Sequence, residues 1–286
     1  MISIVIPAFN EEKAIGQTVR MVREALDPNQ YPDTEILVVD DGSSDRTSEL
    51  AQAAGARVHR HPQNAGYGRT LKEGIRLARH ETIVILDADL SYPAQTIPVL
   101  LEEYGRGFDM VVGARTGHHF RGSMFKGPLR WILKLLVEYA AGRPVPDANS
   151  GLRVFSKSRV EEYLNHLCDT FSFTTSLTLA YLMTGRFVCF LPIEYYERVG
   201  RTKVRLLKDS LRTLRYILQA IIYYNPLKIF ILMSAACVLF STFSFIIGAI
   251  THINAPYYLG IGGLLVTLLV FSLGLLAELL RQIMVK

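Results

Sequence analysis

Two aspartates separated by one residue follow a short apolar run in the segment TIVILDADLSYP, residues 82–93. The run Ile83 to Leu86 is typical of a strand buried on both faces, so Asp87 and Asp89 would stand where the chain leaves the core. Ligands of open α/β sheets bind in the crevice beyond the carboxyl ends of the strands. Two carboxylates so close together repel each other unless a cation holds them. The pair therefore indicates a divalent-cation site, with a solvated loop that starts a helix as the alternative.

Acidic residues also follow two other predicted strands. Glu11 and Glu12 come after the first strand, and Asp40 and Asp41 come after the second. Carboxylates accept hydrogen bonds from base N–H groups and ribose hydroxyls, and they hold hard divalent cations. Together with the aspartate pair, these acids suit a nucleoside diphosphate bound with Mg²⁺ or Mn²⁺.

A dinucleotide is the competing ligand for such a sheet. The fingerprint G-x-G-x-x-G is absent, because Gly66, Gly68 and Gly74 have another spacing. This argues against NAD. The amides around Tyr67 could meet an anionic oxygen at the start of a helix, or the glycines could serve only the packing of the turn.

The first two hundred residues alternate short apolar strands with helical patterns, the βαβ rhythm of a mostly parallel α/β sheet. The predicted strands are 2–6, 35–39, 56–60, 83–86 and 109–113, and the predicted helices lie near 11–26, 45–54, 67–79, 94–104 and 129–141.

The apolar residues, 50% of the chain, are concentrated toward the C-terminus. Residues 227–251 and 257–280 are apolar, with only Lys228 and Glu278 charged. Each run exceeds the roughly 20 residues that a helix needs to cross a bilayer. We predict two membrane spans, and the alternative is a pair of core helices in a soluble protein.

The flanking charges predict the orientation of these spans. The connector HINAP has no Lys or Arg, whereas Lys228, Arg281 and Lys286 lie at the opposite ends of the spans. By the positive-inside rule, the N-terminal part and the C-terminus face the cytoplasm. The expected location is the plasma or inner membrane of the cell, with a multi-pass topology.

A basic segment precedes the first span. The net charge of the chain is +5, and between Arg198 and Lys228 there are eight Lys or Arg and one acid. Leucines recur at helical spacing through Leu207, Leu211 and Leu214. This pattern predicts an amphipathic helix on an anionic membrane surface, which we favour over nucleic-acid binding because the helix leads into a span.

Seven motifs stand in the order IVIPAFNEE, EILVVDDGSSDRT, NAGYGRTLKEG, ILDADLSYP, VVGAR, DANSGLRVFS and IEYYERVGRTK. With them, residues 1–205 resemble the family 2 glycosyltransferases of GT-A fold, and within these the dolichyl-phosphate mannose synthase type. The resemblance implies inverting transfer of a sugar from a UDP- or GDP-linked donor to a polyprenyl phosphate. The expected domains are a cytoplasmic GT-A domain (1–202), an amphipathic juxtamembrane helix (203–225) and a transmembrane hairpin (226–286).

The resemblance also assigns donor-site residues. Those expected around the nucleotide are Pro7, Ala8, Asn10, Glu11, Asp40 and Asp87. Asp40 is expected to contact the base, and Asp87 and Asp89 form the D-x-D pair that holds Mg²⁺ or Mn²⁺ and the diphosphate. Ser91 stands where close relatives have a glutamine as a further ligand, so a metal contact through Ser91 stays open.

The acceptor side follows from chemistry as well. A phosphomonoester, with a second pKa of about 6, is mostly dianionic at neutral pH and needs cationic contacts more than a base. The resemblance gives Arg115, Arg130 and Arg198 as contacts of the acceptor or the diphosphate, with Arg153 and Lys203 as further candidates. For any one of these cations alone, a solvated position is the alternative.

Asp147 opens the DANSG motif, where family 2 enzymes commonly carry an acid near the acceptor. It would be the base for a hydroxyl acceptor, and for a phosphate acceptor it would orient an arginine or the sugar. Asp89, Arg115 and Asp147 are the predicted catalytic residues. Residues 117–127 are predicted to form an acceptor loop or only surface.

Three other functions compete with this one. A processive polysaccharide synthase would need a Q-x-x-R-W segment and more spans, but Gly127 precedes Arg130 and Trp131 where the glutamine belongs. A membrane glycosyltransferase with a sugar-hydroxyl acceptor and a non-catalytic nucleotide-sugar-binding membrane protein stay open. The sequence leaves undecided the sugar, the nucleotide, the lipid length and homo-oligomer formation.

Overall fold

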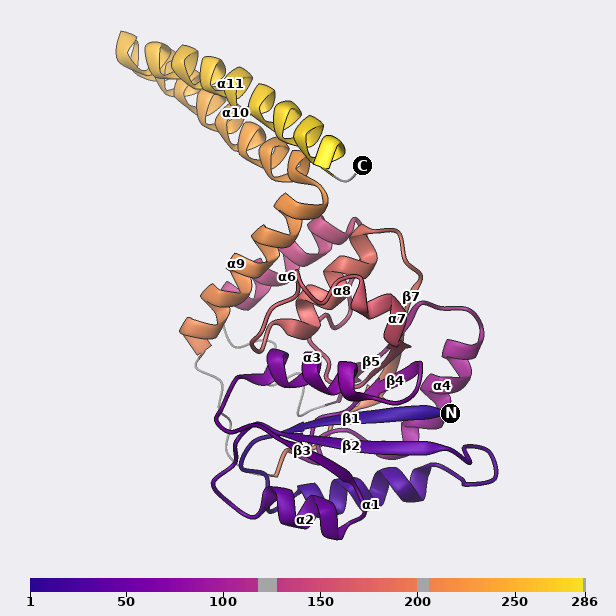
Figure 1. Ribbon diagram of the computed structural model, residues 1–286. Coiled ribbons are helices and arrows are strands. Elements are labelled where there is room, and N and C mark those ends of the chain that lie inside the picture. The colour runs from indigo at the N-terminus through magenta and orange to yellow at the C-terminus, as the bar shows by residue number, and fades with distance from the viewer. Residues whose placement is uncertain (118–127, 200–205, 285–286) are drawn as a thin grey trace. The chain divides into compact units, whose positions relative to one another are not determined.

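The computed structural model describes residues 1–117, 128–199 and 206–284 (Figure 1). The chain divides into two compact units, Met1–Ile217 and Leu218–Lys286. The division falls inside helix α9 (Leu206–Tyr224). The expected domain boundaries at 202/203 and 225/226 stay predictions.

One mixed sheet forms the centre of the first unit. Its strands are β1 (Ile2–Ala8), β2 (Thr34–Asp40), β3 (Arg57–Arg60), β4 (Thr82–Ile85), β5 (Met110–Thr116), β6 (Arg153–Ser156) and β7 (Val188–Glu194). In the described part of the chain the order is β3-β2-β1-β4-β6-β5-β7. Only β6 runs antiparallel to its neighbours among these strands, which confirms the predicted mostly parallel α/β sheet.

Helices cover both faces of this sheet, with α1 and α2 on one side and α3 on the other (Figure 1). The helices and helical turns of the unit that precede α9 are α1 (Ile15–Ala25), α2 (Thr47–Ala53), α3 (Tyr67–Leu77), η1 (Ala94–Thr96), α4 (Ile97–Gly105), α6 (Pro128–Ala141), α7 (Lys157–Glu161) and α8 (Phe173–Met183). Ile4 and Ile6 of β1 share one buried cluster with Val19 of α1. On the opposite face a Cβ at Gly74 would lie 2.4 Å from the Val5 side chain, so glycine there lets α3 lie close on β1.

The parallel strands bring three loops to one edge of the sheet. Ala8 at the end of β1 pairs with Asp40 at the end of β2, and Val5 pairs with Ile85 at the end of β4. The loops that begin after Ala8, Asp40 and Ile85 therefore start side by side. The predicted acids Asp41 and Asp87 follow two of these strand ends.

The part of α9 that belongs to the first unit is both packed and exposed. The Ile217 side chain is fully buried, and the Thr213 and Ser172 hydroxyls lie 2.8 Å apart. Leu211, by contrast, is 53% exposed. The helix therefore buries one apolar row and leaves apolar surface on another, as an amphipathic helix at a membrane surface would.

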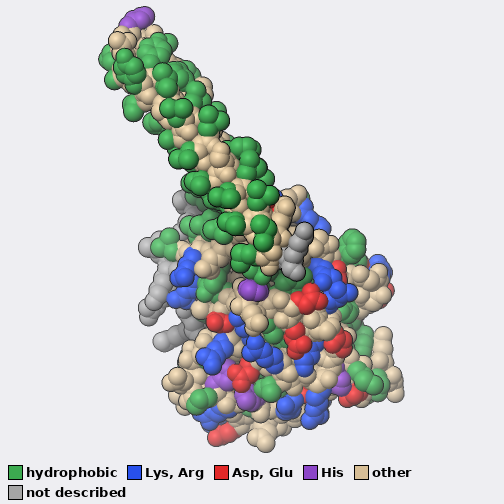
Figure 2. Space-filling model, turned by 45° about the horizontal axis from the view of Figure 1, so that its top comes forward, with side chains coloured by type: hydrophobic (Ala, Val, Ile, Leu, Met, Phe, Trp, Pro, Cys, Tyr) green, Lys and Arg blue, Asp and Glu red, His purple; other side chains and the backbone are tan. Residues whose placement is uncertain are grey.

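The second unit contains the helices α10 (Pro226–Thr251) and α11 (Asn254–Met284), which include both predicted spans. Both are long and apolar enough to cross a membrane, and most of their residues are exposed, unlike core helices of a soluble protein. Figure 2 shows hydrophobic side chains covering this hairpin. A Cβ at Gly263 would lie 2.2 Å from Ser241 Oγ, so small residues let the two helices pack closely.

Candidate active site

The loop after β4 holds Asp89 in a fixed orientation. Asp89 is 4% exposed, and the Ser91 amide donates to Asp89 Oδ1 at 3.1 Å. The Ser91 hydroxyl donates to the same oxygen. Leu90 between them adopts a left-handed backbone, with φ of 62°. Ser91 thus orients a predicted metal ligand, and its own contact with a metal stays a prediction.

Asp87 lies beside Asp89 in surroundings that disfavour a second negative charge. The Tyr67 hydroxyl at the start of α3 donates to Asp87 Oδ1 at 2.8 Å. Burial, and next the charge of Asp89, raise the pKa of Asp87 to about 6. A divalent cation would relieve this repulsion, because it brings the largest local positive charge. Mg²⁺ and Mn²⁺ prefer carboxylate and hydroxyl oxygens as ligand atoms, so these residues fit the expected ion.

The segment after β7 lies along this loop and carries Arg198 to it. The Val199 amide donates to the Asp89 carbonyl at 3.0 Å, and the Tyr196 amide donates to the Ser91 carbonyl at 2.9 Å. The Arg198 guanidinium lies 2.8 Å from Asp89 Oδ2. The structure therefore brings together the D-x-D pair and one of the arginines predicted to contact phosphate.

Arg115 and Asp147 form a second charged pair. Arg115 Nε and Nη2 donate to the two oxygens of Asp147 at 2.7 and 2.9 Å. The guanidinium carbon lies 5.3 Å from the centre of the Tyr195 ring. The side chain of Asp147 is 4% exposed and that of Arg115 is 17% exposed. Both carboxylate oxygens hold the arginine, so the geometry favours an orienting role for Asp147 over that of a free base.

The DANSG loop that contains Asp147 lies against the D-x-D pair. A Cβ at Gly151 would lie 2.3 Å from Asp87 Oδ2, and the Gly151 amide donates to the Tyr92 hydroxyl at 2.6 Å. A side chain at Gly151 would displace the Asp87 carboxylate. The glycine therefore allows the acceptor-side loop and the metal-side loop to meet.

Arg153 does not lie on the surface of the site. It is fully buried, and its guanidinium donates to the carbonyls of Ser150 and Thr174 and to the Thr178 hydroxyl. Burial lowers the pKa of Arg153 to about 10, so the group stays charged at neutral pH. An acceptor cannot reach a fully buried side chain, and the expected contact of Arg153 with phosphate is replaced by a role in positioning the loop before β6.

Asp40 has its carboxylate occupied by its own loop. It is fully buried, the Ser43 amide donates to Oδ1 at 2.9 Å, and the Ser48 hydroxyl donates to Oδ2. Arg60 Nε lies 3.6 Å from Oδ2. The predicted contact of Asp40 with a base stays a prediction, and a base would have to share these oxygens.

The loops after β1 and β2 are joined by hydrogen bonds. The Asn10 amide donates to Ser43 Oγ at 2.8 Å, and Asn10 Oδ1 accepts the Ser44 amide at 2.9 Å. The Glu11 amide donates to Thr47 Oγ1 at 2.8 Å. Asn10 adopts a left-handed backbone, with φ of 52°. These contacts position the predicted nucleotide residues of the first strand beside those of the second.

The remaining predicted residues are placed as follows. Pro7 and Ala8 end β1 and pair with Val39 and Asp40 of β2. Arg130 lies in α6, but its side chain is outside the described residues, as are Lys203 and the segment 118–127 of the expected acceptor loop.

Sequence reasoning missed the contacts that two side chains of this region make. The Tyr67 hydroxyl donates to Asp87, whereas the sequence analysis considered only the backbone amides around Tyr67. The sequence signal for this contact is a tyrosine between two glycines at the start of a helix. Asp41 accepts the Ala65 and Gly66 amides at 2.7 and 2.9 Å. At Gly68 a Cβ would lie 2.3 Å from a backbone oxygen. These two observations favour the packing alternative for this turn.

The profile of Glycosyl transferase family 2 matches residues 3–164. The match covers more than half of the 286 residues, so the chain belongs to glycosyl transferase family 2. The prediction of this family from the seven motifs is confirmed.

Several curated relatives have the same name. The chain is 30% identical to an undecaprenyl-phosphate 4-deoxy-4-formamido-L-arabinose transferase of Edwardsiella ictaluri, over 79% of this chain and 69% of the relative. It is 29% identical to the transferase of that name from Yersinia pestis, over 91% of this chain and 80% of the relative. An uncharacterized protein of Methanocaldococcus jannaschii is 35% identical over 58% of this chain and 69% of that protein.

Solved structures share the fold. Glucosyl-3-phosphoglycerate synthase from Mycobacterium tuberculosis, in complex with Mn²⁺, uridine diphosphate and glucosyl-3-phosphoglycerate, has a TM-score of 0.60 at 22% identity. The similarity covers 77% of this chain and 79% of that one. A further mycobacterial protein has a TM-score of 0.63 at 20% identity, over 77% of this chain and 74% of that one.

Proposed function

We propose that this chain transfers a sugar from a nucleotide-sugar to a polyprenyl phosphate with inversion, giving a lipid-linked sugar phosphate. The observation that carries the proposal is the pair of Arg115 and Asp147, in which both carboxylate oxygens hold the guanidinium. Among the described residues, Asp147 on this side of the site is bonded to a guanidinium and is not a free base. The printed names of the curated relatives support undecaprenyl phosphate as the class of acceptor.

An acceptor phosphate needs no base because it is already ionised. A phosphomonoester loses its second proton at about pH 6, so a dianion predominates at neutral pH. One of its oxygens forms the new bond to the anomeric carbon of the sugar, and the bond from that carbon to the donor diphosphate breaks. Arg115 and Arg198 would supply the positive charge that brings two phosphate groups together.

Asp87 and Asp89 would hold the divalent cation, which as a Lewis acid offsets the charge on the leaving nucleoside diphosphate. Ser91 and Tyr67 keep the two carboxylates oriented, since each donates to one of them. We propose Mg²⁺ or Mn²⁺, because the donor atoms are oxygens and the synthase with the same fold binds Mn²⁺ with uridine diphosphate.

The helices α10 and α11 would anchor the enzyme in the inner membrane, with the catalytic unit on the cytoplasmic side. The connector between them lacks Lys and Arg, and the opposite ends of the helices carry Lys228 and Arg281. The exposed apolar surface of α9 at Leu211 would lie on the membrane and keep the site close to a lipid headgroup.

A transfer assay with matched acceptors tests the proposal. The full-length protein receives radiolabelled UDP- and GDP-sugars together with either undecaprenyl phosphate or undecaprenol, which differ only in the phosphate. We expect one donor to label the phosphate acceptor alone, with loss of activity in EDTA and a product cleaved by mild acid. Labelling of undecaprenol, or of an added oligosaccharide, would instead establish a hydroxyl acceptor.

A further inference from the structure

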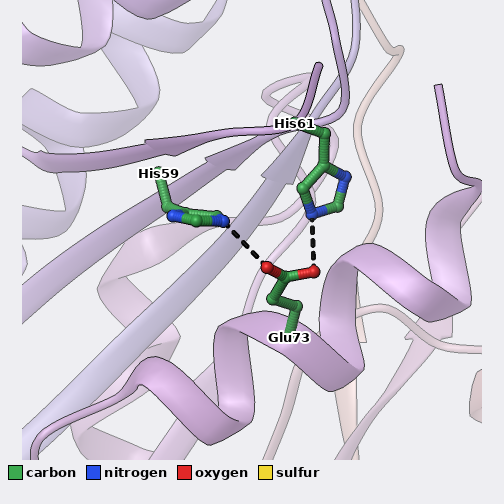
Figure 3. A group of neighbouring side chains, drawn as sticks. All are labelled: His59, His61 and Glu73. Atoms are coloured by element: carbon green, nitrogen blue, oxygen red, sulfur yellow. Dashed lines mark hydrogen bonds and ion pairs between the residues drawn. The ribbon is translucent and has the colours of Figure 1, made fainter. Parts of the chain in front are cut away.

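Three side chains away from the predicted catalytic residues form another group of metal ligands (Figure 3). His59 lies on β3, His61 follows that strand, and Glu73 lies on α3. His59 Nε2 is 2.9 Å from Glu73 Oε1, and His61 Nε2 is 3.0 Å from Glu73 Oε2. One ligand atom from each residue lies within 4.8 Å of the others. The glutamate therefore faces both imidazoles at once.

The local fold explains why these side chains meet. Residues two apart along an extended strand point to the same face, which places His59 and His61 together. His59 pairs with Val39 of β2, and a Cβ at Gly74 would lie 3.0 Å from the Val39 side chain. The glycine thus lets α3 approach the sheet, and this approach brings the preceding Glu73 to the two histidines.

A carboxylate lies beside each ring nitrogen of His61, which favours binding of a cation there. His61 is 5% exposed, with Nδ1 2.8 Å from Asp41 Oδ1 and Nε2 3.0 Å from Glu73 Oε2. A neutral imidazole has one N–H, so it can donate to only one of these carboxylates. Nε2 makes no aligned hydrogen bond despite its distance from Glu73. A buried nitrogen is therefore aimed at a carboxylate without a well-formed bond between them.

Asp41 completes the arrangement on the other side of the ring. If Nδ1 donates to Asp41, then Nε2 presents its lone pair toward Glu73 and His59. A carboxylate that fixes the tautomer in this way is the usual support of a metal-binding histidine. Asp41 is itself held by the Ala65 and Gly66 amides. The ring is thus oriented by a rigid partner before any ion binds.

We propose that His59, His61 and Glu73 bind Zn²⁺, with water as the fourth ligand. Two imidazoles and one carboxylate form a ligand set that zinc takes in tetrahedral geometry, whereas Mg²⁺ prefers oxygen ligands alone. The side chains of His59 and Glu73 are 37% and 36% exposed, which leaves room for water and for entry of the ion. This site is chemically distinct from the D-x-D pair.

The ion would connect the end of β3 to α3 next to the donor site. Arg60, between the two histidines, donates to the Ser43 carbonyl at 2.6 Å. Tyr67 on the same helix as Glu73 donates to Asp87. Zinc would therefore stabilise the strand end and the helix that flank the predicted nucleotide and cation residues.

Cobalt spectroscopy on tag-free, full-length protein in detergent tests this site. Co²⁺ reports tetrahedral ligation by its visible absorption, and Zn²⁺ added afterwards should displace it, whereas Mg²⁺ should not. We expect His59→Ala and Glu73→Gln each to weaken Co²⁺ and Zn²⁺ binding by at least about 10-fold. The matched control is His166→Ala, which removes an exposed histidine elsewhere and should bind as the wild type does.

A further variant separates this ion from the one at the active site. Asp89→Asn should keep the tetrahedral cobalt spectrum, because its carboxylate belongs to the other site. Unchanged binding in His59→Ala and Glu73→Gln, or loss of the spectrum in Asp89→Asn, would overturn the proposal. Since His59 and Glu73 are both partly exposed, thermal unfolding should show that at least one of the two variants is folded.

Discussion

At the amino end of β2, the Glu35 carboxylate accepts hydrogen bonds from the Ser3 hydroxyl at 2.6 Å, the Arg79 amide at 2.8 Å and the Arg57 guanidinium at 2.7 Å. Burial works to raise the pKa of Glu35, but these bonds outweigh it and lower the pKa. At the other end of the same parallel strands, burial and a neighbouring acid raise the pKa of Asp87 to about 6.

We call the sheet edge at the amino ends of the parallel strands the amino rim and the edge at their carboxyl ends the carboxyl rim. A buried acid has opposite surroundings at the two rims. The amino rim surrounds one carboxylate with donors, so its charge stabilises the fold. The carboxyl rim places Asp87 and Asp89 close together, where Arg198 pairs with Asp89 but the pKa of Asp87 is still raised, so a bound cation would relieve the remaining repulsion. Perturbed acids in such an arrangement are typical of functional sites, and satisfied acids are typical of structural ones. Substitutions at the two rims should then separate activity from stability.

The largest effect is expected from Asp89→Asn at the carboxyl rim. Loss of this carboxylate should abolish sugar transfer, because the cation loses a ligand, while the protein still folds. The measurement is transfer at saturating Mn²⁺ together with the midpoint of thermal unfolding. Glu35→Gln is the matched control, with transfer per folded molecule unchanged. Substantial transfer by Asp89→Asn, or by the wild type in chelator, would contradict the assignment of this rim to catalysis.

The carboxyl rim was readable from local sequence patterns, whereas the carboxylate role of Glu35 at the amino rim was not predicted. The runs 2–6, 35–39 and 83–86 predicted parallel strands, and the acids after them predicted the rim where ligands bind. Periodicity reports which residues are buried, and loops after parallel strands meet at one edge, so no long-range information was needed.

Other features depend on contacts between distant segments. The antiparallel insertion of β6 between β4 and β5 was not predicted, and it is the position of Arg153 at the start of β6 that sends this side chain into the core. Its type and its DANSG neighbourhood had suggested a phosphate contact. The pairing of Arg115 with Asp147 likewise joins residues 32 positions apart, which sequence spacing alone does not reveal.

The next effect concerns the cations of the carboxyl rim. Arg115→Ala should raise the barrier to transfer by about 2–5 kcal/mol, the range for removing one partner of a buried hydrogen-bonded charge pair. Arg115→Lys should recover only part of the rate, because an ammonium lacks the bidentate guanidinium geometry. Asp147→Asn should retain a substantial rate with the same saturating nucleotide-sugar, because asparagine keeps one acceptor oxygen for the Arg115 guanidinium. If Asp147→Asn were inactive and Arg115→Ala nearly normal, the acceptor would be a hydroxyl.

A smaller effect is expected at the amino rim. Glu35→Gln should lower the free energy of unfolding by about 1–3 kcal/mol, since it removes charged hydrogen bonds to Ser3 and Arg57. The matched control is Glu24→Gln at an exposed position, which should change stability by less than about 0.5 kcal/mol. Thermal and urea unfolding measure both variants. If Glu35→Gln lost no more stability than Glu24→Gln, the hydrogen bonds to Glu35 would not stabilise the fold, and the structural role of the amino rim would be wrong.

The smallest effect is the dependence of this contribution on pH, and its sign follows from the lowered pKa of Glu35. An unfolded glutamate titrates at about pH 4.3, above the folded value, so on acidification the unfolded chain takes up the proton first. The contribution of Glu35 is therefore complete above that pH and is lost as the pH falls through the folded pKa. The difference in unfolding free energy between wild type and Glu35→Gln should stay constant from about pH 6 to 8 and shrink below about pH 4. Because the variant has no titrating group at this position, the difference isolates one carboxylate from the other acids of the chain. A difference that grew on acidification would mean that Glu35 is held protonated, like a carboxylate that lacks partners, and the contrast between the two rims would be wrong.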